Sequence, residues 1–177
     1  MLEEVVGFTW YNRGLKKIIF VLFNEKAYRT FKEVFKEHLD RIKKKIERHP
    51  VPAVDIIIEK DGAIILVERK NPPFGWALPG GFVEVGESVE TAAGREAEEE
   101  TGIKVRELKQ FHVYSKPDRD PRFHTISCVF TAGTEDEPKA ASDAKKAEFF
   151  REGELPDEIT FDHRRILSDY FKSRKGK

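Results

Sequence analysis

Residues 81–103 read GFVEVGESVETAAGREAEEETGI, and this stretch predicts a helix entered from a glycine-containing loop. Residues 88–101 are rich in helix-forming types, and Gly102 directly follows them. Glycine is the usual residue just past a helix end, because it adopts the left-handed conformation without steric cost. We therefore expect a helix over 88–101 that ends at this glycine.

Three glutamates of this helix are expected to form a cation site. Glu96, Glu99 and Glu100 stand at positions i, i+3 and i+4, so they project from one face and repel one another. An acidic surface helix is the alternative, but Arg95 is the only base within 88–101 and cannot neutralise so many glutamates. Oxygen ligands suit a hard ion such as Mg²⁺ or Mn²⁺, which commonly bridges phosphate oxygens. The helix therefore indicates metal-assisted phosphoryl or pyrophosphoryl transfer.

The flanking sequence predicts a mixed α/β domain. Residues 54–59 and 63–69 show a β-hairpin pattern around an Asp-Gly turn, which suits the positive backbone angles of a tight loop. Further elements are expected as strands at 103–114, 124–131 and 147–151, a polar loop at 133–146 and a closing helix at 161–172. We therefore assign residues 51–177 to one domain.

Residues 1–50 are predicted to form an extension to this domain. Short strands are expected at 5–10 and 16–23, followed by an amphipathic helix at 27–48 whose apolar positions recur at three- and four-residue spacing. The basic end of this helix is compatible with a nucleic-acid patch, but a solvated helix face is the favoured interpretation. Its apolar stripe is expected to pack on the main domain or on a second subunit.

The composition excludes several classes of protein. The chain has 177 residues, with 32 basic and 32 acidic side chains, a balance unlike that of a disordered tail, a collagen or a membrane bundle. Cys128 is the single cysteine and cannot form an internal disulfide. The longest apolar run, 18–23, is far shorter than the roughly 20 residues of a membrane helix. We therefore predict a cytoplasmic protein that acts on a small molecule, without a nucleic-acid or membrane partner.

The 81–103 stretch resembles the signature of the Nudix hydrolase family, which is G-x5-E-x7-R-E-U-x-E-E-x-G-U with U an aliphatic residue. Every fixed position of the signature is filled, by Gly81, Glu87, Arg95, Glu96, Glu99, Glu100 and Gly102. Ala97 and Ile103 occupy the aliphatic positions. The resemblance covers about residues 52–170 and implies an α/β Nudix fold, in which a mixed sheet is sandwiched between helices.

The resemblance also implies roles for the signature residues. The metal ligands that it implies, for Mg²⁺ or Mn²⁺, are Glu96, Glu99, Glu100 and the carbonyl of Gly81. The catalytic residues that it implies are Glu99 and Glu100, with Arg95 and Glu87 orienting the carboxylate cluster. The general base stays open between the signature helix, through Glu99 or Glu100, and an acidic loop at 135–143, through Glu137 or Asp143.

A segment beyond the signature points to the substrate. Pro117 lies fifteen positions after Gly102, and residues 114–127 resemble the corresponding segment of ADP-ribose pyrophosphatases. Side chains that offer donors to phosphate and ribose oxygens from this region are Lys116, Arg119, Arg122 and His124, together with Arg69 at the end of a strand. Alternatively, prolines rigidify the loop and its bases pair with Asp118 and Asp120, while the arginine at the strand end pairs with a neighbouring glutamate.

The predicted function is therefore divalent-metal-dependent hydrolysis of ADP-ribose to AMP and ribose 5-phosphate, or of a related nucleoside diphosphate-sugar. One alternative is a Nudix hydrolase of oxidised nucleoside triphosphates or dinucleoside polyphosphates, in which the Pro117 segment is not expected. Another is a regulatory protein that senses ADP-ribose, although such sensors usually have a damaged signature. Because similar enzymes often dimerise through an N-terminal extension, a homodimer is also expected.

Overall fold

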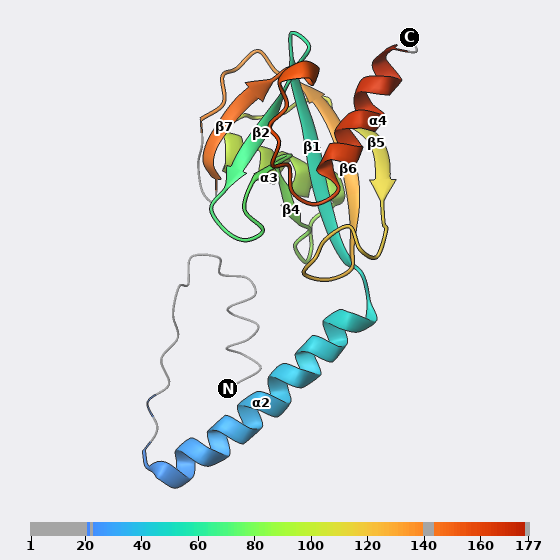
Figure 1. Cartoon of the computed structure of the whole chain (residues 1–177). Helices are drawn as coiled ribbons and strands as arrows, with labels where there is room; N and C mark the ends of the chain where they lie inside the picture. Colours follow the sequence, from blue (N-terminus) through green and yellow to red (C-terminus); the bar gives the residue numbers. More distant parts are fainter. Residues whose placement is uncertain (1–20, 22, 140–143, 176–177) are drawn as a thin grey trace. The chain divides into compact units, whose positions relative to one another are not determined.

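The computed structural model describes residues 21, 23–139 and 144–175, and it divides the chain into two compact units, Met1–His49 and Pro50–Lys177. In the first unit, helix α2 (Glu25–Arg48) confirms the helix predicted at 27–48 (Figure 1). It begins after Asn24, whose side-chain oxygen accepts a hydrogen bond from the Ala27 amide at 2.9 Å. The strands predicted at 5–10 and 16–23 lie outside the described residues, apart from positions 21 and 23.

The second unit is built on one mixed sheet. Its described strands are β1 (Val51–Lys60), β2 (Ala63–Arg69), β3 (Trp76–Ala77), β4 (Gly80–Phe82), β5 (Lys109–Tyr114), β6 (Thr125–Gly133) and β7 (Ala144–Phe150). They follow the order β3-β2-β1-β6-β5, while β4 pairs with β1 and β7 pairs with β2. The β1–β6 pair is parallel and the other pairs are antiparallel. The predicted hairpin is confirmed as β1 and β2.

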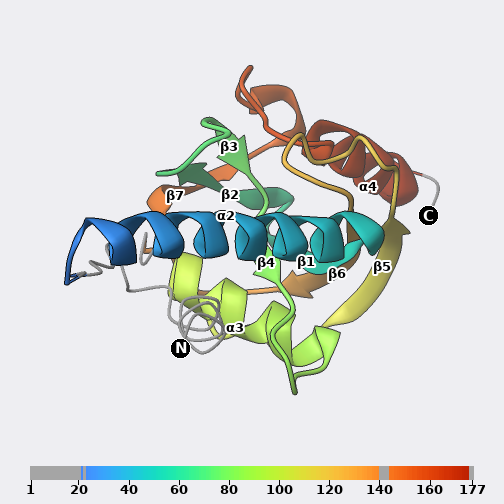
Figure 2. The same cartoon turned by 90° about the horizontal axis from the view of Figure 1, so that it is seen from below.

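Two helices cover the two faces of this sheet. Helices α3 (Val89–Thr101) and α4 (His163–Lys175) lie on opposite sides of it in Figure 2. Strand β1 supplies Ile57 to the core beneath α4 and Ile56 and Ile58 to the core beneath α3, so it is apolar on both faces. This arrangement confirms the predicted mixed sheet sandwiched between helices.

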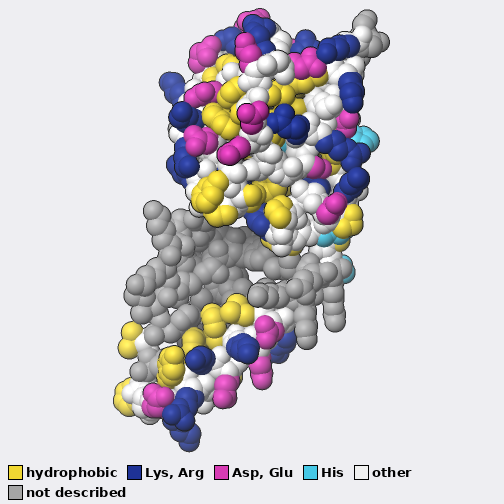
Figure 3. All heavy atoms as spheres, viewed as in Figure 1, with side chains coloured by type: hydrophobic (Ala, Val, Ile, Leu, Met, Phe, Trp, Pro, Cys, Tyr) yellow, Lys and Arg dark blue, Asp and Glu magenta, His cyan; other side chains and the backbone are white. Residues whose placement is uncertain are grey.

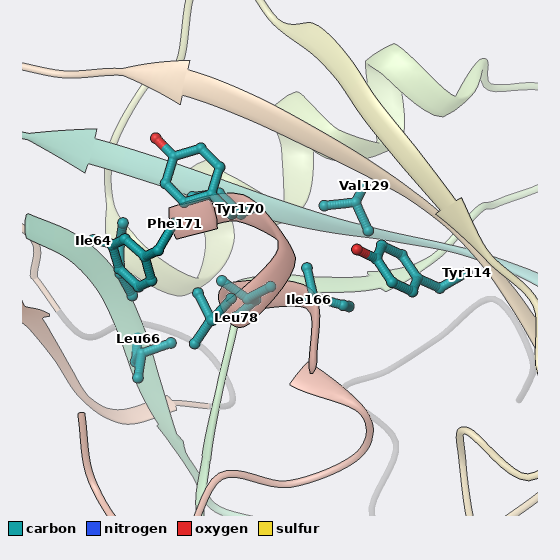
Figure 4. Close-up of a cluster of buried hydrophobic side chains, with 10 residues drawn as sticks. Ile64, Leu66, Leu78, Tyr114, Val129, Ile166, Tyr170 and Phe171 are labelled. Carbon is teal, nitrogen blue, oxygen red and sulfur yellow. The ribbon is translucent and has the colours of Figure 1, made fainter. Parts of the chain in front are cut away.

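The core beneath α4 also holds the segment that leads into the signature. Figure 4 shows Leu78 lying among Leu66, Ile166 and Phe171, at the contact between the sheet and α4. Only 2% of Leu78 is exposed. Its burial fixes one end of the short segment that connects β3 to β4.

Several element boundaries differ by a few residues from the sequence-based predictions, and the starts of β5 and β7 have identifiable causes. The strand predicted at 103–114 begins only at Lys109, because Glu107 has a φ of 53°, which interrupts extended backbone. Strand β7 begins at Ala144, so the end of the predicted 133–146 loop is part of the sheet. This polar segment forms a strand because its backbone pairs with β2. Its sequence alone predicted a loop.

The surface reflects the composition of the chain, in which many charged residues of both signs give a net charge of zero. Figure 3 shows acidic and basic side chains interspersed over the visible face of the second unit. Among the helices that the structure describes, none combines the length and the apolar character needed to cross a membrane.

Candidate active site

The signature helix is α3, and local interactions at both ends fix its register. Ser88 is the N-cap, and its Oγ accepts a hydrogen bond from the Thr91 amide at 3.2 Å. Gly102 ends the helix with a φ of 71°, and its amide donates to the Glu98 carbonyl. The helix therefore begins and ends within one residue of the prediction.

Arg95 joins the carboxylates of the signature. Its guanidinium contacts Glu87 at 2.6 Å, Glu96 at 2.8 Å and Glu99 at 3.4 Å, and it also donates to the Phe82 carbonyl at 3.1 Å. The hydrogen bond with Glu87, opposed by partial burial and reinforced by Glu96, raises the pKa of Arg95 above its ordinary value. The guanidinium therefore stays charged and holds side chains from the loop and the helix together.

Two glycines bring the backbone of β4 against the carboxylates of α3. The Gly80 amide donates to Glu100 Oε2 at 3.0 Å. A methyl group at Gly81 would lie 2.2 Å from Glu96 Oε1, and one at Gly80 would lie 2.2 Å from the Val54 carbonyl oxygen. Gly80 therefore requires glycine, since a side chain would push β4 away from β1, whereas a side chain at Gly81 would displace either the Glu96 carboxylate or β4.

The donor set of this site fits a hard divalent cation. Glu96, Glu99 and Glu100 offer carboxylate oxygens, and the Gly81 backbone lies against the first of them. In the structure these carboxylates are turned toward Arg95 and the Gly80 amide. Accordingly, over residues 21, 23–139 and 144–175, no three or more His, Cys, Asp or Glu side chains are grouped to hold a metal ion. One guanidinium offsets only one of the three charges that it contacts, so the site keeps an acidic character.

Arg119, predicted to contact substrate, lies inside the protein. Only 4% of its side chain is exposed, and it contacts Asp162 at 2.8 Å, Thr125 at 2.9 Å and Asp55 at 3.2 Å. The structure therefore places this side chain beneath the surface, with hydrogen bonds to three residues of the fold, and its predicted contact with substrate stays a prediction. The loop between β5 and β6 turns this arginine inward, where the buried Asp55 and the partly buried Asp162, from distant segments, require a counter-charge.

Arg122 lies at the surface and follows the alternative in which loop bases pair with loop acids. It makes two hydrogen bonds with Asp120, at 3.0 and 2.7 Å. Its guanidinium also lies 5.5 Å from the ring centroids of Phe82 and Phe123 and 5.2 Å from that of Phe161. With 37% of its side chain exposed, Arg122 is positioned beside β4 and accessible from outside.

Arg69 joins the same group from the end of β2. Its Nε donates to the Pro73 carbonyl at 2.8 Å, and its guanidinium lies 4.9 Å from the Phe161 ring centroid. We use the name aromatic-arginine cluster for Arg69, Phe82, Arg122, Phe123 and Phe161. Its three phenylalanines were missed by sequence reasoning, because they come from three separate segments.

The remaining predicted residues lie at or near the surface. Pro117 is exposed, and His124 Nε2 lies 3.1 Å from the Ser115 carbonyl oxygen. In the acidic loop, Glu137 contacts Lys60 at 2.7 Å, and Asp143 lies outside the described residues.

Sequence reasoning also missed a buried polar network on the α4 side of β4. Its members are Asp55, Arg119, Ser127, Asp162 and His163. A signal was present, since Asp55 stands within the apolar run of β1, where an ionised side chain needs buried partners. Its partners come from β6, from the loop between β5 and β6, and from the start of α4. Because these segments are far apart in the chain, no local sequence pattern reveals the contacts.

Known proteins resemble this chain in sequence and in fold. A family model described as the NUDIX domain matches residues 49–170. An ADP-ribose pyrophosphatase of Methanocaldococcus jannaschii is 49% identical over 151 residues, which cover 84% of this chain and 88% of that protein. The solved structure of a MutT NUDIX hydrolase from Burkholderia pseudomallei is 31% identical with a TM-score of 0.63, covering 68% of this chain and 97% of that one.

A bifunctional NMN adenylyltransferase/ADP ribose pyrophosphatase from Francisella tularensis is 29% identical with a TM-score of 0.64, covering 80% of this chain and 46% of that one. The chain therefore belongs to the Nudix family, and its complete signature and its extended likeness to a family enzyme identify it as a Nudix pyrophosphohydrolase. Hydrolases of this family generally use divalent metal ions.

Proposed function

We propose that this enzyme hydrolyses the diphosphate bond of ADP-ribose to give AMP and ribose 5-phosphate, or that of a closely related nucleoside diphosphate-sugar. The observation that carries the proposal is the 49% identity with an ADP-ribose pyrophosphatase, which extends over 151 residues and so far beyond the signature. The Pro117 segment supports the same substrate class, because it resembles the segment that follows the signature in those enzymes.

In this proposal the signature residues hold Mg²⁺ or Mn²⁺. The ligands would be Glu96, Glu99, Glu100 and the Gly81 carbonyl, and the bound ion would neutralise the diphosphate and lower the pKa of a coordinated water. Arg95 keeps the carboxylates assembled through its contacts with Glu87, Glu96 and Glu99. With that ion bound, water would attack one phosphorus of the diphosphate and displace the other phosphate group, so no covalent enzyme intermediate would be required.

The aromatic-arginine cluster would receive the diphosphate and its attached groups. Arg122 lies over Phe82 of β4, the strand that also carries Gly81, and Arg69 shares the Phe161 ring with Arg122, so both charges would be available to the diphosphate on this side of the site. Arg119 would contribute indirectly, because it belongs to the buried polar network and holds Asp55 and Asp162 in place. The attacking water would lose its proton to Glu99 or Glu100, or to Glu137 or Asp143 of the acidic loop. Normal turnover in both Glu137→Gln and Asp143→Asn would exclude the loop bases.

We also propose that the protein acts as a cytoplasmic homodimer, with residues 1–50 contributing to the interface. Supporting this are three apolar side chains of α2 that remain exposed in the single chain, Tyr28 at 49%, Val34 at 43% and Leu39 at 39%. Light scattering coupled to size-exclusion chromatography would give twice the mass of 20.5 kDa. A single-chain mass at micromolar concentration would contradict the dimer.

A substrate panel tests the proposed reaction. Hydrolysis would be followed by chromatography of the products from ADP-ribose, NADH, a diadenosine polyphosphate and oxidised dGTP, each with Mg²⁺ and with Mn²⁺. A clear preference for ADP-ribose that is lost in Glu100→Gln is the expected result. A preference for the triphosphate or the dinucleotide would contradict the proposed substrate, and no turnover with any compound would favour an ADP-ribose sensor.

A further inference from the structure

His163 bridges two segments that are distant in the chain. It is 3% exposed, its Nδ1 accepts a hydrogen bond from the Leu78 amide at 2.9 Å, and its Nε2 lies 3.2 Å from Asp55 Oδ1. A backbone amide only donates, so Nδ1 carries the lone pair and the ring proton is on Nε2, directed at Asp55. The ring is therefore a neutral bridge between a carboxylate of β1 and the backbone of the loop before β4.

The carboxylate at the other end of this bridge is itself held from several sides. Asp55 Oδ2 accepts from Ser127 Oγ at 2.5 Å and from Arg119 Nη2 at 3.2 Å. The arginine in turn makes two hydrogen bonds with Asp162, which directly precedes the histidine. Burial by itself raises the pKa of Asp55, but His163, Arg119 and Ser127 favour its charged form and hold the pKa below its ordinary value. A closed ring of contacts therefore fixes the imidazole.

The segment held by His163 leads directly to the proposed metal ligands. Three residues after Leu78, the Gly81 backbone lies against Glu96, and between them Gly80 donates to Glu100. On its other side Gly80 approaches Asp55, since a methyl group there would lie 2.8 Å from Asp55 Oδ1. One four-residue backbone thus lies between the buried network and the signature carboxylates.

We propose that His163 is a positioning residue for the metal site, acting through the Leu78 amide to place the Gly81 carbonyl and the Gly80 amide. The inference rests on the proposed function, in which the Gly81 carbonyl is a metal ligand. Without the Nδ1 acceptor, the buried Leu78 amide loses its partner and the 78–81 backbone shifts to find another. A small displacement there moves a ligand directly, whereas the core beneath α4 keeps its apolar contacts.

A matched pair of variants separates the two halves of the bridge. In His163→Asn the side-chain oxygen takes the place of Nδ1 and can accept from the Leu78 amide, but the contact with Asp55 is lost. In His163→Gln the side-chain nitrogen takes the place of Nε2 and can donate to Asp55, but the acceptor for Leu78 is lost. Ser127→Ala is the control, because it removes one hydrogen bond of Asp55 and leaves the histidine in place.

Four measurements apply to each variant: kcat for ADP-ribose, the affinity for Mn²⁺ alone by calorimetry, hydrogen exchange of the Leu78 amide, and the midpoint of thermal unfolding. In His163→Gln we expect about a 10- to 100-fold loss of kcat and of Mn²⁺ affinity, with faster exchange of this amide. In His163→Asn and Ser127→Ala both quantities stay within about threefold of the wild type, although thermal stability falls in both.

Equal losses in the asparagine and glutamine variants would overturn the proposal, since the histidine would then only stabilise the fold. If the glutamine variant does not fold, the asparagine variant decides alone. A protected Leu78 amide combined with a tenfold or greater loss of Mn²⁺ affinity would contradict positioning through that amide, and retained affinity would support it. If the wild type hydrolyses no substrate of the panel, the proposed function fails, while the Mn²⁺ titrations and amide exchange still test His163.

Discussion

Two arginines each gather several carboxylates, but they do so in opposite settings. Arg95 contacts Glu87, Glu96 and Glu99, which lie eight, one and four positions away in the chain, and 21% of its side chain is exposed. Arg119 contacts Asp55 and Asp162, which lie 64 and 43 positions away, and 4% of its side chain is exposed. The first group is local and more exposed, and the second is more deeply buried and joins distant segments.

The difference in charge and burial suggests a different task for each arginine. Arg95 offsets one of three carboxylate charges, so its site favours a bound cation. Around Arg119 two carboxylates meet one guanidinium, one neutral histidine and the hydroxyls of Thr125 and Ser127. Over the described residues no buried side-chain nitrogen or oxygen lacks a hydrogen-bond partner. A fully satisfied network of this kind holds one geometry, because any rearrangement leaves a buried polar group unpaired.

The largest effect is expected from the more exposed group. Replacing Glu99 or Glu100 by glutamine removes a negative charge from the proposed metal site while keeping the shape of the side chain. We expect kcat to fall by about 10³-fold or more, comparable to the loss of an essential charge-stabilising group. The midpoint of thermal unfolding should change little, since the Glu99 side chain is 42% exposed. Near-normal turnover in both variants would refute the metal assignment.

The buried group should respond in the opposite way. Arg119→Met leaves Asp55 and Asp162 without their shared counter-charge, and breaking a buried ion pair typically costs about 3 kcal/mol or more of the free energy of unfolding. Arg95→Met, the matched variant at the more exposed arginine, should lose activity with a smaller loss of stability, because 21% of the Arg95 side chain is exposed. Chemical denaturation of both variants checks the contrast. Equal stability losses would show that the two arginines do not differ as proposed.

The sequence revealed the first group and concealed the second for a physical reason. Helical spacing places Glu96, Glu99 and Glu100 on one face, so their proximity follows from local geometry alone. The contacts of Arg119 depend on how β1, the loop between β5 and β6, and the start of α4 pack together. No local sequence periodicity encodes this packing. Because Arg119 is close to Pro117 in the sequence, we predicted a contact with substrate. The stronger clue to its buried position was Asp55, an aspartate within the apolar run of β1 that needs a buried partner.

The fold was predictable to a similar extent. The hairpin, the signature helix and the closing helix follow from turn residues, caps and apolar spacing. The early start of β7 did not, because Ala144 and the two lysines after it form a strand only through pairing with β2. Tertiary hydrogen bonding there outweighs the polar character of the segment.

A smaller loss of activity is expected from a change in the Gly80–Gly81 backbone, which lies between Asp55 of the buried network and Glu96 of the signature helix. In Gly81→Ala the added methyl would lie 2.2 Å from Glu96 Oε1, so the carboxylate or β4 must move. We expect about a tenfold loss of Mn²⁺ affinity and of kcat, in line with displacement of a metal ligand. Gly86→Ala is the control, because a methyl group at Gly86 meets no atom within 4 Å, although its φ of 92° carries some strain. Unchanged Mn²⁺ affinity in Gly81→Ala would show that the glutamate adapts without cost.

The smallest effect concerns the dependence of stability on pH. The folded pKa of Asp55 lies below its ordinary value of 3.8, so its charged form stabilises the fold above that pH, and this contribution is lost as the pH falls toward the folded pKa. Between pH 5 and pH 3 the loss amounts to about 1 kcal/mol. Denaturation of the wild type and of Asp55→Asn across this range isolates it, since all other carboxylates are common to both proteins. The difference in stability between them should shrink as the pH falls. A constant difference would mean that Asp55 does not titrate differently in the folded and unfolded states, which would contradict an ionised carboxylate at the centre of the buried network.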